Sequence, residues 1–233
     1  MHNYKSLTGI TLVFLLVFSL EAQSTVSKDI YLEAGEKTNR KVSSVSGDIT
    51  IGQKVEIAND VSTVSGDIEI GPRSKVEDVE TVSGDIAVAK GAQVGKLESV
   101  SGDIELYGNN RVDGRIKTVS GDVNAQTGSD IHSDIETVSG DIEMDDTRVR
   151  GDLATTSGDI SLFNGTFVDG SIFIHRKKNP MQMKMGKLEI TVDLNSVVKG
   201  SIIVDEDDTN VVVYLSNGGK VEGEVVNAKL IRQ

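Results

Sequence analysis

The chain has 233 residues, and its 24 lysine and arginine residues against 36 aspartate and glutamate residues give a net charge of -12. That charge repels phosphate backbones and excludes nucleic acid as an expected partner. Cysteine and tryptophan are absent, and only five phenylalanines and four tyrosines are present. Disulfide scaffolds, thiolate metal sites and cysteine nucleophiles are therefore excluded, and the core must be built from aliphatic side chains.

Residues 1–22 have the pattern of a secretory signal peptide. Lys5 is followed by an almost wholly apolar run from Leu7 to Leu20, and Glu21 and Ala22 complete a plausible cleavage site. The run is shorter than the roughly 20 residues that span a bilayer, which favours cleavage over a retained anchor. We therefore predict that the mature chain begins near Gln23, is secreted or periplasmic, and has no transmembrane span.

A six-residue motif then recurs along most of the chain. Its eight copies are TVSKDI (25–30), SVSGDI (44–49), TVSGDI (63–68), TVSGDI (81–86), SVSGDI (99–104), TVSGDV (118–123), TVSGDI (137–142) and TTSGDI (155–160). Successive copies lie 18 or 19 residues apart, a period typical of solenoids that leaves no room for a helix. We predict an all-β fold, a single-stranded parallel β-helix with three short strands in each turn.

Aliphatic residues recur at fixed distances from the motif serine and form five predicted core columns. Strand alternation predicts that those three and five residues after the serine both face inward. Four of the five predicted core columns are Ile30, Ile49, Ile68, Ile86, Ile104, Val123, Ile142 and Ile160; Leu32, Ile51, Ile70, Val88, Leu106, Ala125, Met144 and Leu162; Val42, Val61, Val79, Leu97, Ile116, Ile135 and Leu153; and Ile57, Val76, Val94, Val112, Ile131, Val149 and Val168. The fifth column is the valine just before each serine: Val26, Val45, Val64, Val82, Val100, Val119 and Val138. The changes between 18 and 19 residues are expected at corners, where they leave the columns in register.

The predicted organisation has four segments: a signal peptide (1–22), a regular β-helix (23–174), a basic, methionine-rich loop (175–187) and degenerate β-helix turns (188–233). The last segment is assigned because the step Val168-x-Gly-x-Ile repeats from Val198 and, more loosely, from Val221. Two further turns bring the total to about ten.

The aspartates of the motif form a column with one carboxylate in each turn, about 4.8 Å from the next. One interpretation is structural: glycine takes an unusual backbone angle at the corner, and the Ser and Asp side chains accept hydrogen bonds there. The alternative is a column that binds Ca²⁺ or another hard cation. The candidate ligands would be Asp48, Asp67, Asp85, Asp103, Asp122, Asp141 and Asp159. No other cofactor is expected.

The loop has the sequence HRKKNPMQMKMGK, with five basic residues and no acidic one. Its candidate interaction residues are Arg176, Lys177, Lys178, Met181, Met183 and Met185. It could bind an anionic partner, bind Cu(I) through thioethers and His175, or cover a neighbouring turn with its methionine face. His132 and His175 lack sequence partners at a spacing that would predict a catalytic triad or a three-histidine metal site.

The Val-x-Gly-x-Ile steps and the turn length resemble bactofilins, and the serial SGDI copies resemble a secreted, adhesin-like β-strand-repeat family. The bactofilin resemblance implies a right-handed coil and end-to-end polymers. Because seven consecutive turns vary by only one residue in length, no long loop is available to form a catalytic cleft. We therefore predict a non-catalytic extracytoplasmic scaffold or adhesin-like interaction protein, capable of self-association end to end or of binding a cell-envelope or polysaccharide partner. The alternatives are a carbohydrate-active or acyl-transferring enzyme, or a Ca²⁺-binding surface module.

Overall fold

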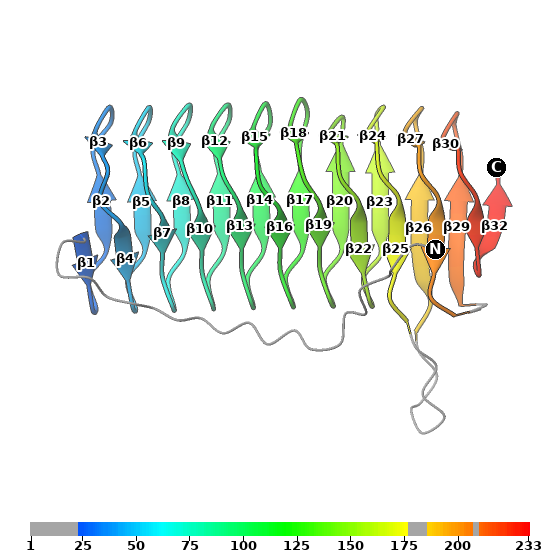
Figure 1. The fold of residues 1–233 in the computed structure, drawn as a ribbon, viewed down its shortest axis with the longest axis horizontal. Coiled ribbons are helices and arrows are strands. Elements are labelled where there is room, and N and C mark those ends of the chain that lie inside the picture. Colours follow the sequence, from blue (N-terminus) through cyan, green and yellow to red (C-terminus); the bar gives the residue numbers. More distant parts are fainter. Residues whose placement is uncertain (1–22, 177–185, 207–209) are drawn as a thin grey trace, which may run out of the picture.

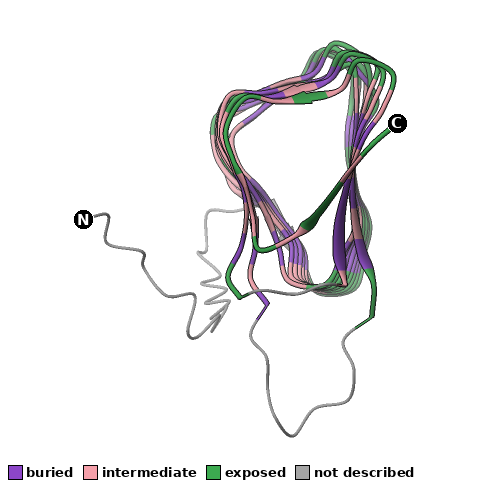
Figure 2. Ribbon diagram, turned by 90° about the vertical axis from the view of Figure 1, so that its right-hand side faces the viewer, coloured by how far each residue is buried: buried purple, intermediate pink, exposed green. Residues whose placement is uncertain are grey.

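The computed structural model describes residues 23–176, 186–206 and 210–233. These residues form a stack of solenoid turns built from parallel β-strands, with no helix (Figure 1). Every strand pairs in parallel with the strand one turn away. Viewed along the stack, the turns superpose on one another around a common core (Figure 2). The predicted all-β solenoid of about ten turns is confirmed.

Three sheets run the length of the stack. Sheet A contains β1 (Gln23–Thr25), β4 (Val42–Ser44), β7 (Val61–Ser62), β10 (Val79–Glu80), β13 (Leu97–Glu98), β16 (Ile116–Lys117), β19 (Ile135–Glu136), β22 (Leu153–Thr155), β25 (Ile172–Ile174), β28 (Ile202–Val204) and β31 (Val225–Val226). Sheet B contains β2 (Ile30–Leu32), β5 (Ile49–Ile51), β8 (Ile68–Ile70), β11 (Ile86–Val88), β14 (Ile104–Leu106), β17 (Val123–Ala125), β20 (Ile142–Asp145), β23 (Ile160–Phe163), β26 (Leu188–Val192), β29 (Val211–Leu215) and β32 (Lys229–Arg232). Sheet C contains β3 (Lys37–Thr38), β6 (Glu56–Ile57), β9 (Lys75–Val76), β12 (Gln93–Val94), β15 (Arg111–Val112), β18 (Asp130–Ile131), β21 (Arg148–Val149), β24 (Phe167–Val168), β27 (Val197–Val198) and β30 (Lys220–Val221).

The register confirms four of the predicted core columns and the two degenerate turns. Their members are buried, nearly all completely, and each pairs with its counterpart in the next turn, as Ile104 does with Val123. Val168 pairs with Val198, which pairs with Val221. Such β-branched and aliphatic stacks suit a pleated interior because their side chains lose little rotamer freedom there.

The fifth predicted column is wrong. The valines from Val45 to Val138 are partly exposed, and Val26 is 72% exposed. The reason lies in strand alternation. Val61 faces inward, so Thr63 faces inward as well and Val64 faces outward. A residue three positions from Val61 cannot share its face, so the inward place belongs to the first residue of the motif. Those residues are Ser44, Thr63, Thr81, Ser99, Thr118, Thr137 and Thr155, and all are buried.

These buried hydroxyl groups join consecutive turns at the corner between sheets A and B. The hydroxyl of Thr118 accepts a hydrogen bond from the N–H of Gly121 (3.1 Å) and donates to the carbonyl of Gly102 in the preceding turn (3.3 Å). Thr137 makes the same two contacts with Gly140 and Gly121. The hydroxyl therefore satisfies backbone groups that the corner withdraws from the sheets.

The motif glycines are required by close approach and not by an unusual backbone angle. None of them has a positive φ. A Cβ added to Gly121 would overlap the carbonyl oxygen of Gly102, and the same holds for each motif glycine and its counterpart one turn earlier. Lys28 takes this position in the first described turn, where the described residues place no earlier carbonyl beneath it.

Candidate interaction surfaces

The motif aspartates form a continuous hydrogen-bonded ladder along the A–B corner. One carboxylate oxygen of each residue accepts the backbone N–H of the next aspartate, at 2.7–3.1 Å, and Asp159 accepts the N–H of Glu189. The ladder includes every candidate cation ligand from Asp48 to Asp159. A carboxylate that accepts a backbone N–H stabilises the corner by a charge-assisted hydrogen bond, so these bonds favour a structural role for the aspartates. The role predicted for the motif serines is wrong: among the described residues they are exposed, and the first residue of the motif accepts the corner N–H instead. Within the described part of the chain, no group of three or more His, Cys, Asp or Glu residues is arranged to hold a metal ion.

Removing one hydrogen-bond acceptor from this ladder should lower the free energy of unfolding more than removing one negative charge. Asp103→Ala leaves the partly buried N–H of Asp122 without its acceptor, and we expect the free energy of unfolding to fall by about 1–3 kcal/mol. Asp103→Asn keeps an oxygen acceptor and relieves repulsion in the column, so its effect should stay within about 0.5 kcal/mol. Urea denaturation of both variants measures the difference.

The effect of Ca²⁺ on thermal stability tests the alternative, cation-binding interpretation of the aspartate column. We expect the melting temperature of the wild-type chain to be the same with and without millimolar Ca²⁺ at fixed ionic strength. A rise that is lost in Asp103→Ala would instead support the cation interpretation, because a ligand that binds only the folded state stabilises it.

A row of outward-facing valines runs beside the aspartate ladder. We call Val45, Val64, Val82, Val100, Val119 and Val138 the valine row; all six are partly exposed. The serine that follows each of them is exposed. Because neighbouring turns lie about 4.8 Å apart, the row is a regular apolar line at the edge of sheet A, with carboxylates on one side.

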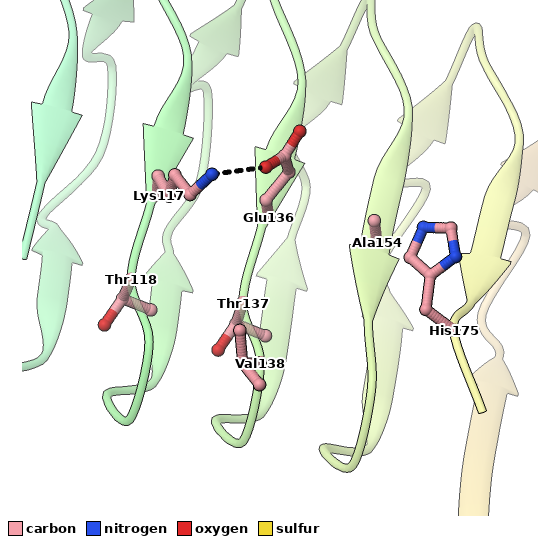
Figure 3. A pocket seen from close by; sticks show the side chains of 7 residues that line it. All are labelled: Lys117, Thr118, Glu136, Thr137, Val138, Ala154 and His175. Atoms are coloured by element: carbon pink, nitrogen blue, oxygen red, sulfur yellow. Dashed lines mark hydrogen bonds and ion pairs between the residues drawn. The ribbon is translucent and has the colours of Figure 1, made fainter. Parts of the chain in front are cut away.

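A shallow notch lies further along sheet A, where the outward column contains a small residue (Figure 3). Ala154 lies between Glu136 and the imidazole of His175, and Lys117 forms an ion pair with Glu136 at 3.0 Å. The His175 ring stacks on Phe173, with ring centroids 6.2 Å apart, and its Nδ1 lies 3.2 Å from Asp205. The notch has a volume of about 20 Å³, which is enough for about one water molecule.

The outer face of sheet C holds a network of paired charges. The Arg150 guanidinium lies 2.7 Å from Asp130, and His132 lies between Asp130 (2.9 Å) and Asp113 (3.4 Å). The hydrogen bond from Arg150 is the main cause that lowers the pKa of Asp130 to about 2, with His132 acting in the same direction against burial. His132 and His175 thus each have an aspartate partner from another part of the chain, which the sequence spacing did not reveal.

A second network joins sheet A to the preceding corner. Lys96 contacts Glu80, and its ammonium lies 3.3 Å from Glu98, whose other oxygen lies 2.6 Å from Arg115. Burial would raise the pKa of Glu98, but Arg115 and Lys96 hold it below its ordinary value. These charges are paired with one another and contribute to the cohesion of adjacent turns.

One family model matches this chain over residues 19–131 and again over residues 72–224, and its description is Toastrack DUF4097. The chain belongs to the toastrack DUF4097 family. The two toastrack matches overlap and together reach across nearly all of the repeats. They establish a β-solenoid repeat family and identify neither a bactofilin nor an adhesin. No curated protein and no solved structure matches the chain.

The described ends of the basic stretch of this toastrack chain, 175–176 and 186–187, lie at the A–B corner between β25 and β26. Arg176, one of the candidate interaction residues, is 4% exposed. It donates to the carbonyls of Thr156 (3.2 Å) and Gly186 (2.9 Å), so its guanidinium lies inside the corner. Lys177, Lys178, Met181, Met183 and Met185 lie outside the described residues. The described residues contain no helix long and apolar enough to cross a bilayer.

Proposed function

We propose that this toastrack chain is a non-catalytic, extracytoplasmic scaffold whose copies associate side by side, with the valine row of one copy contacting the basic stretch of another. The observation that carries the proposal is the outward position of the valine row. An extracytoplasmic location rests on the signal-peptide pattern of residues 1–22.

The repeated motif itself separates structural positions from displayed ones. Its first residue bonds the corner backbone, its glycine allows close approach, its aspartate forms the ladder, and its last residue fills the core. The valine and serine contribute to none of these contacts through their side chains and face outward in turn after turn. A regular line of partly exposed apolar groups is the kind of surface that binds another chain.

Charge complementarity indicates the partner. The valine row lies beside a column of carboxylates, so a matching segment needs apolar groups together with positive charges. The stretch His175–Lys187 has both, with alternating methionines, no acidic residue and, besides the buried Arg176, four lysines. Because the chain carries the acidic row and the basic stretch together, a second copy supplies each surface with its complement.

Sedimentation velocity of residues 23–233 over a range of concentrations tests this proposal. We expect association at low salt that weakens at high salt. The triple variant Val82→Thr, Val100→Thr, Val119→Thr keeps β-branched side chains, and Lys177→Gln, Lys178→Gln, Lys184→Gln removes charge from the basic stretch. Each should weaken association by ~10-fold or more.

The matched control changes outward residues of sheet B, with Ala87→Ser, Asn124→Thr and Ser161→Thr, and should behave as the wild type. A wild-type chain that stays monomeric at all concentrations would overturn the proposal. So would association that survives in both triple variants, since that result would indicate contact between the ends of the stacks.

A further inference from the structure

The corner between sheets B and C contains a column of left-handed residues. Its members are Gly35, Lys54, Arg73, Gly91, Asn109, Gly128, Asp146, Gly165, Asn195 and Gly218, each with a positive φ. From Gly35 to Asn195, each backbone N–H donates to a carbonyl of the next turn at 2.8–3.2 Å. Gly218 belongs to the last of these corners in the structure, and among the described residues no carbonyl accepts its N–H.

Two members of this column follow an asparagine, which gives two Asn-Gly pairs with similar backbone angles and the same kind of side-chain contact. Asn164 and Asn217 have φ values of 53° and 45°, and their glycines have φ values of 81° and 87°. The side-chain amide of Asn164 donates to Asp145 at 2.6 Å, and that of Asn217 donates to Asp193 at 2.8 Å. The two peptide groups are held to neighbouring turns through opposite ends. Gly165 donates its N–H to Leu194 at 2.8 Å, whereas the carbonyl of Asn217 accepts the N–H of Asn195 at 3.1 Å and no described group accepts the Gly218 N–H.

That backbone nitrogen is the nucleophile in the spontaneous loss of ammonia from asparagine. Glycine offers no side chain to hinder its approach, so Asn-Gly is the dipeptide in which this reaction is easiest. A nitrogen held in a hydrogen bond between two turns must first be released by local opening, which costs free energy. The Gly218 nitrogen donates to no described group, so it can lose its proton and attack without first breaking a hydrogen bond of its own.

We propose that Asn217 is a site of spontaneous deamidation, and that Asn164 is protected from the same reaction. The Gly218 nitrogen loses its proton to water or hydroxide and attacks Cγ of Asn217. A carbon–nitrogen bond forms, the bond from Cγ to the amide nitrogen breaks, and that nitrogen leaves as ammonia. Water then opens the resulting succinimide at either carbonyl and leaves an aspartyl or isoaspartyl residue.

The product changes the contact that holds the corner. The amide donor that bonds Asp193 becomes a carboxylate, which faces the Asp193 carboxylate as a like charge. An isoaspartyl linkage also lengthens the backbone at a residue whose φ is fixed by the tight turn. Modification should therefore loosen the last turn while leaving the earlier turns intact.

Mass spectrometry of residues 23–233, incubated folded at mildly alkaline pH, tests the proposal. The two asparagines fall in separate tryptic peptides, because Arg150 and Arg176 bracket Asn164, while Lys199 and Lys220 bracket Asn217. We expect the mass increase from replacing NH₂ by OH to accumulate at Asn217 at least ~10-fold faster than at Asn164. Fragment ions distinguish Asn217 from Asn210 in the same peptide.

The same incubation in concentrated urea is the internal control. Unfolding removes the hydrogen bond of Gly165, so the two Asn-Gly pairs should then react at similar rates. Equal rates in the folded chain, or faster reaction at Asn164, would overturn the proposal. A difference that persists unchanged in urea would also overturn it, because local sequence and not the fold would then be the cause.

Discussion

Replacing Gly121 with alanine is expected to lower the free energy of unfolding by about 3 kcal/mol or more. The added Cβ would overlap the carbonyl oxygen of Gly102, which is backbone and cannot rotate away. Relief requires the two turns to separate at the A–B corner. That separation would also weaken the contacts of Thr118 and of the aspartate ladder beside it.

Two other glycines serve as controls for this effect. A Cβ on Gly186 meets nothing within 4 Å, and that glycine has no positive φ, so Gly186→Ala should change the stability by no more than about 0.5 kcal/mol. Gly35 also has open space but has a φ of 79°, so Gly35→Ala should cost about 1 kcal/mol through backbone strain alone. Urea midpoints that rank the three variants differently would contradict the close-approach explanation.

The second large loss of unfolding free energy is expected for Thr118→Val. The substitution preserves the volume of a fully buried side chain but removes the acceptor of the Gly121 N–H and the donor to the Gly102 carbonyl. An unpaired buried backbone group costs about 1–3 kcal/mol, and we expect a loss of unfolding free energy in that range. Thermal and urea denaturation measure it.

Thr118→Ser retains the hydroxyl and should lose less unfolding free energy than Thr118→Val. Ser44 and Ser99 occupy the same position in other turns. Thr50→Val, on the outward face of β5, is the control for the change of residue type and should be nearly neutral. If Thr118→Val proved as stable as the wild type, the hydroxyl would be no more than a substitute for an aliphatic side chain.

The repeat period and the aliphatic positions were sufficient to predict the architecture. A turn of 18 or 19 residues must close on itself, and parallel pairing in register is the arrangement that aligns Ile104 with Val123 and Leu106 with Ala125. The extra residue of the longer turns also lies at a corner, as expected. Val61 follows Ile57 by four positions, whereas Val79 follows Val76 by three, and both pairs keep their columns.

The surfaces were predicted less well, for a physical reason. A valine is apolar whether it faces inward or outward, so its recurrence at one place in the repeat led to the prediction that Val100 and its counterparts lie in the core. Their three-residue distance from an inward position forbids it. The partners of His132 and His175 were not apparent either. Asp113 and Asp205 come next to these rings from other turns of the chain.

By itself, the sequence determined the fold class, the number of turns and most of the core, because periodicity and hydrophobicity act on every turn alike. Only the tertiary structure decided what each motif residue does. The hydrogen bonds of Thr118 and Asp103, and the space denied to a side chain at Gly121, all depend on the neighbouring turn. Contacts between turns have no signature within one copy of the repeat, since they arise from the distance between two copies after stacking.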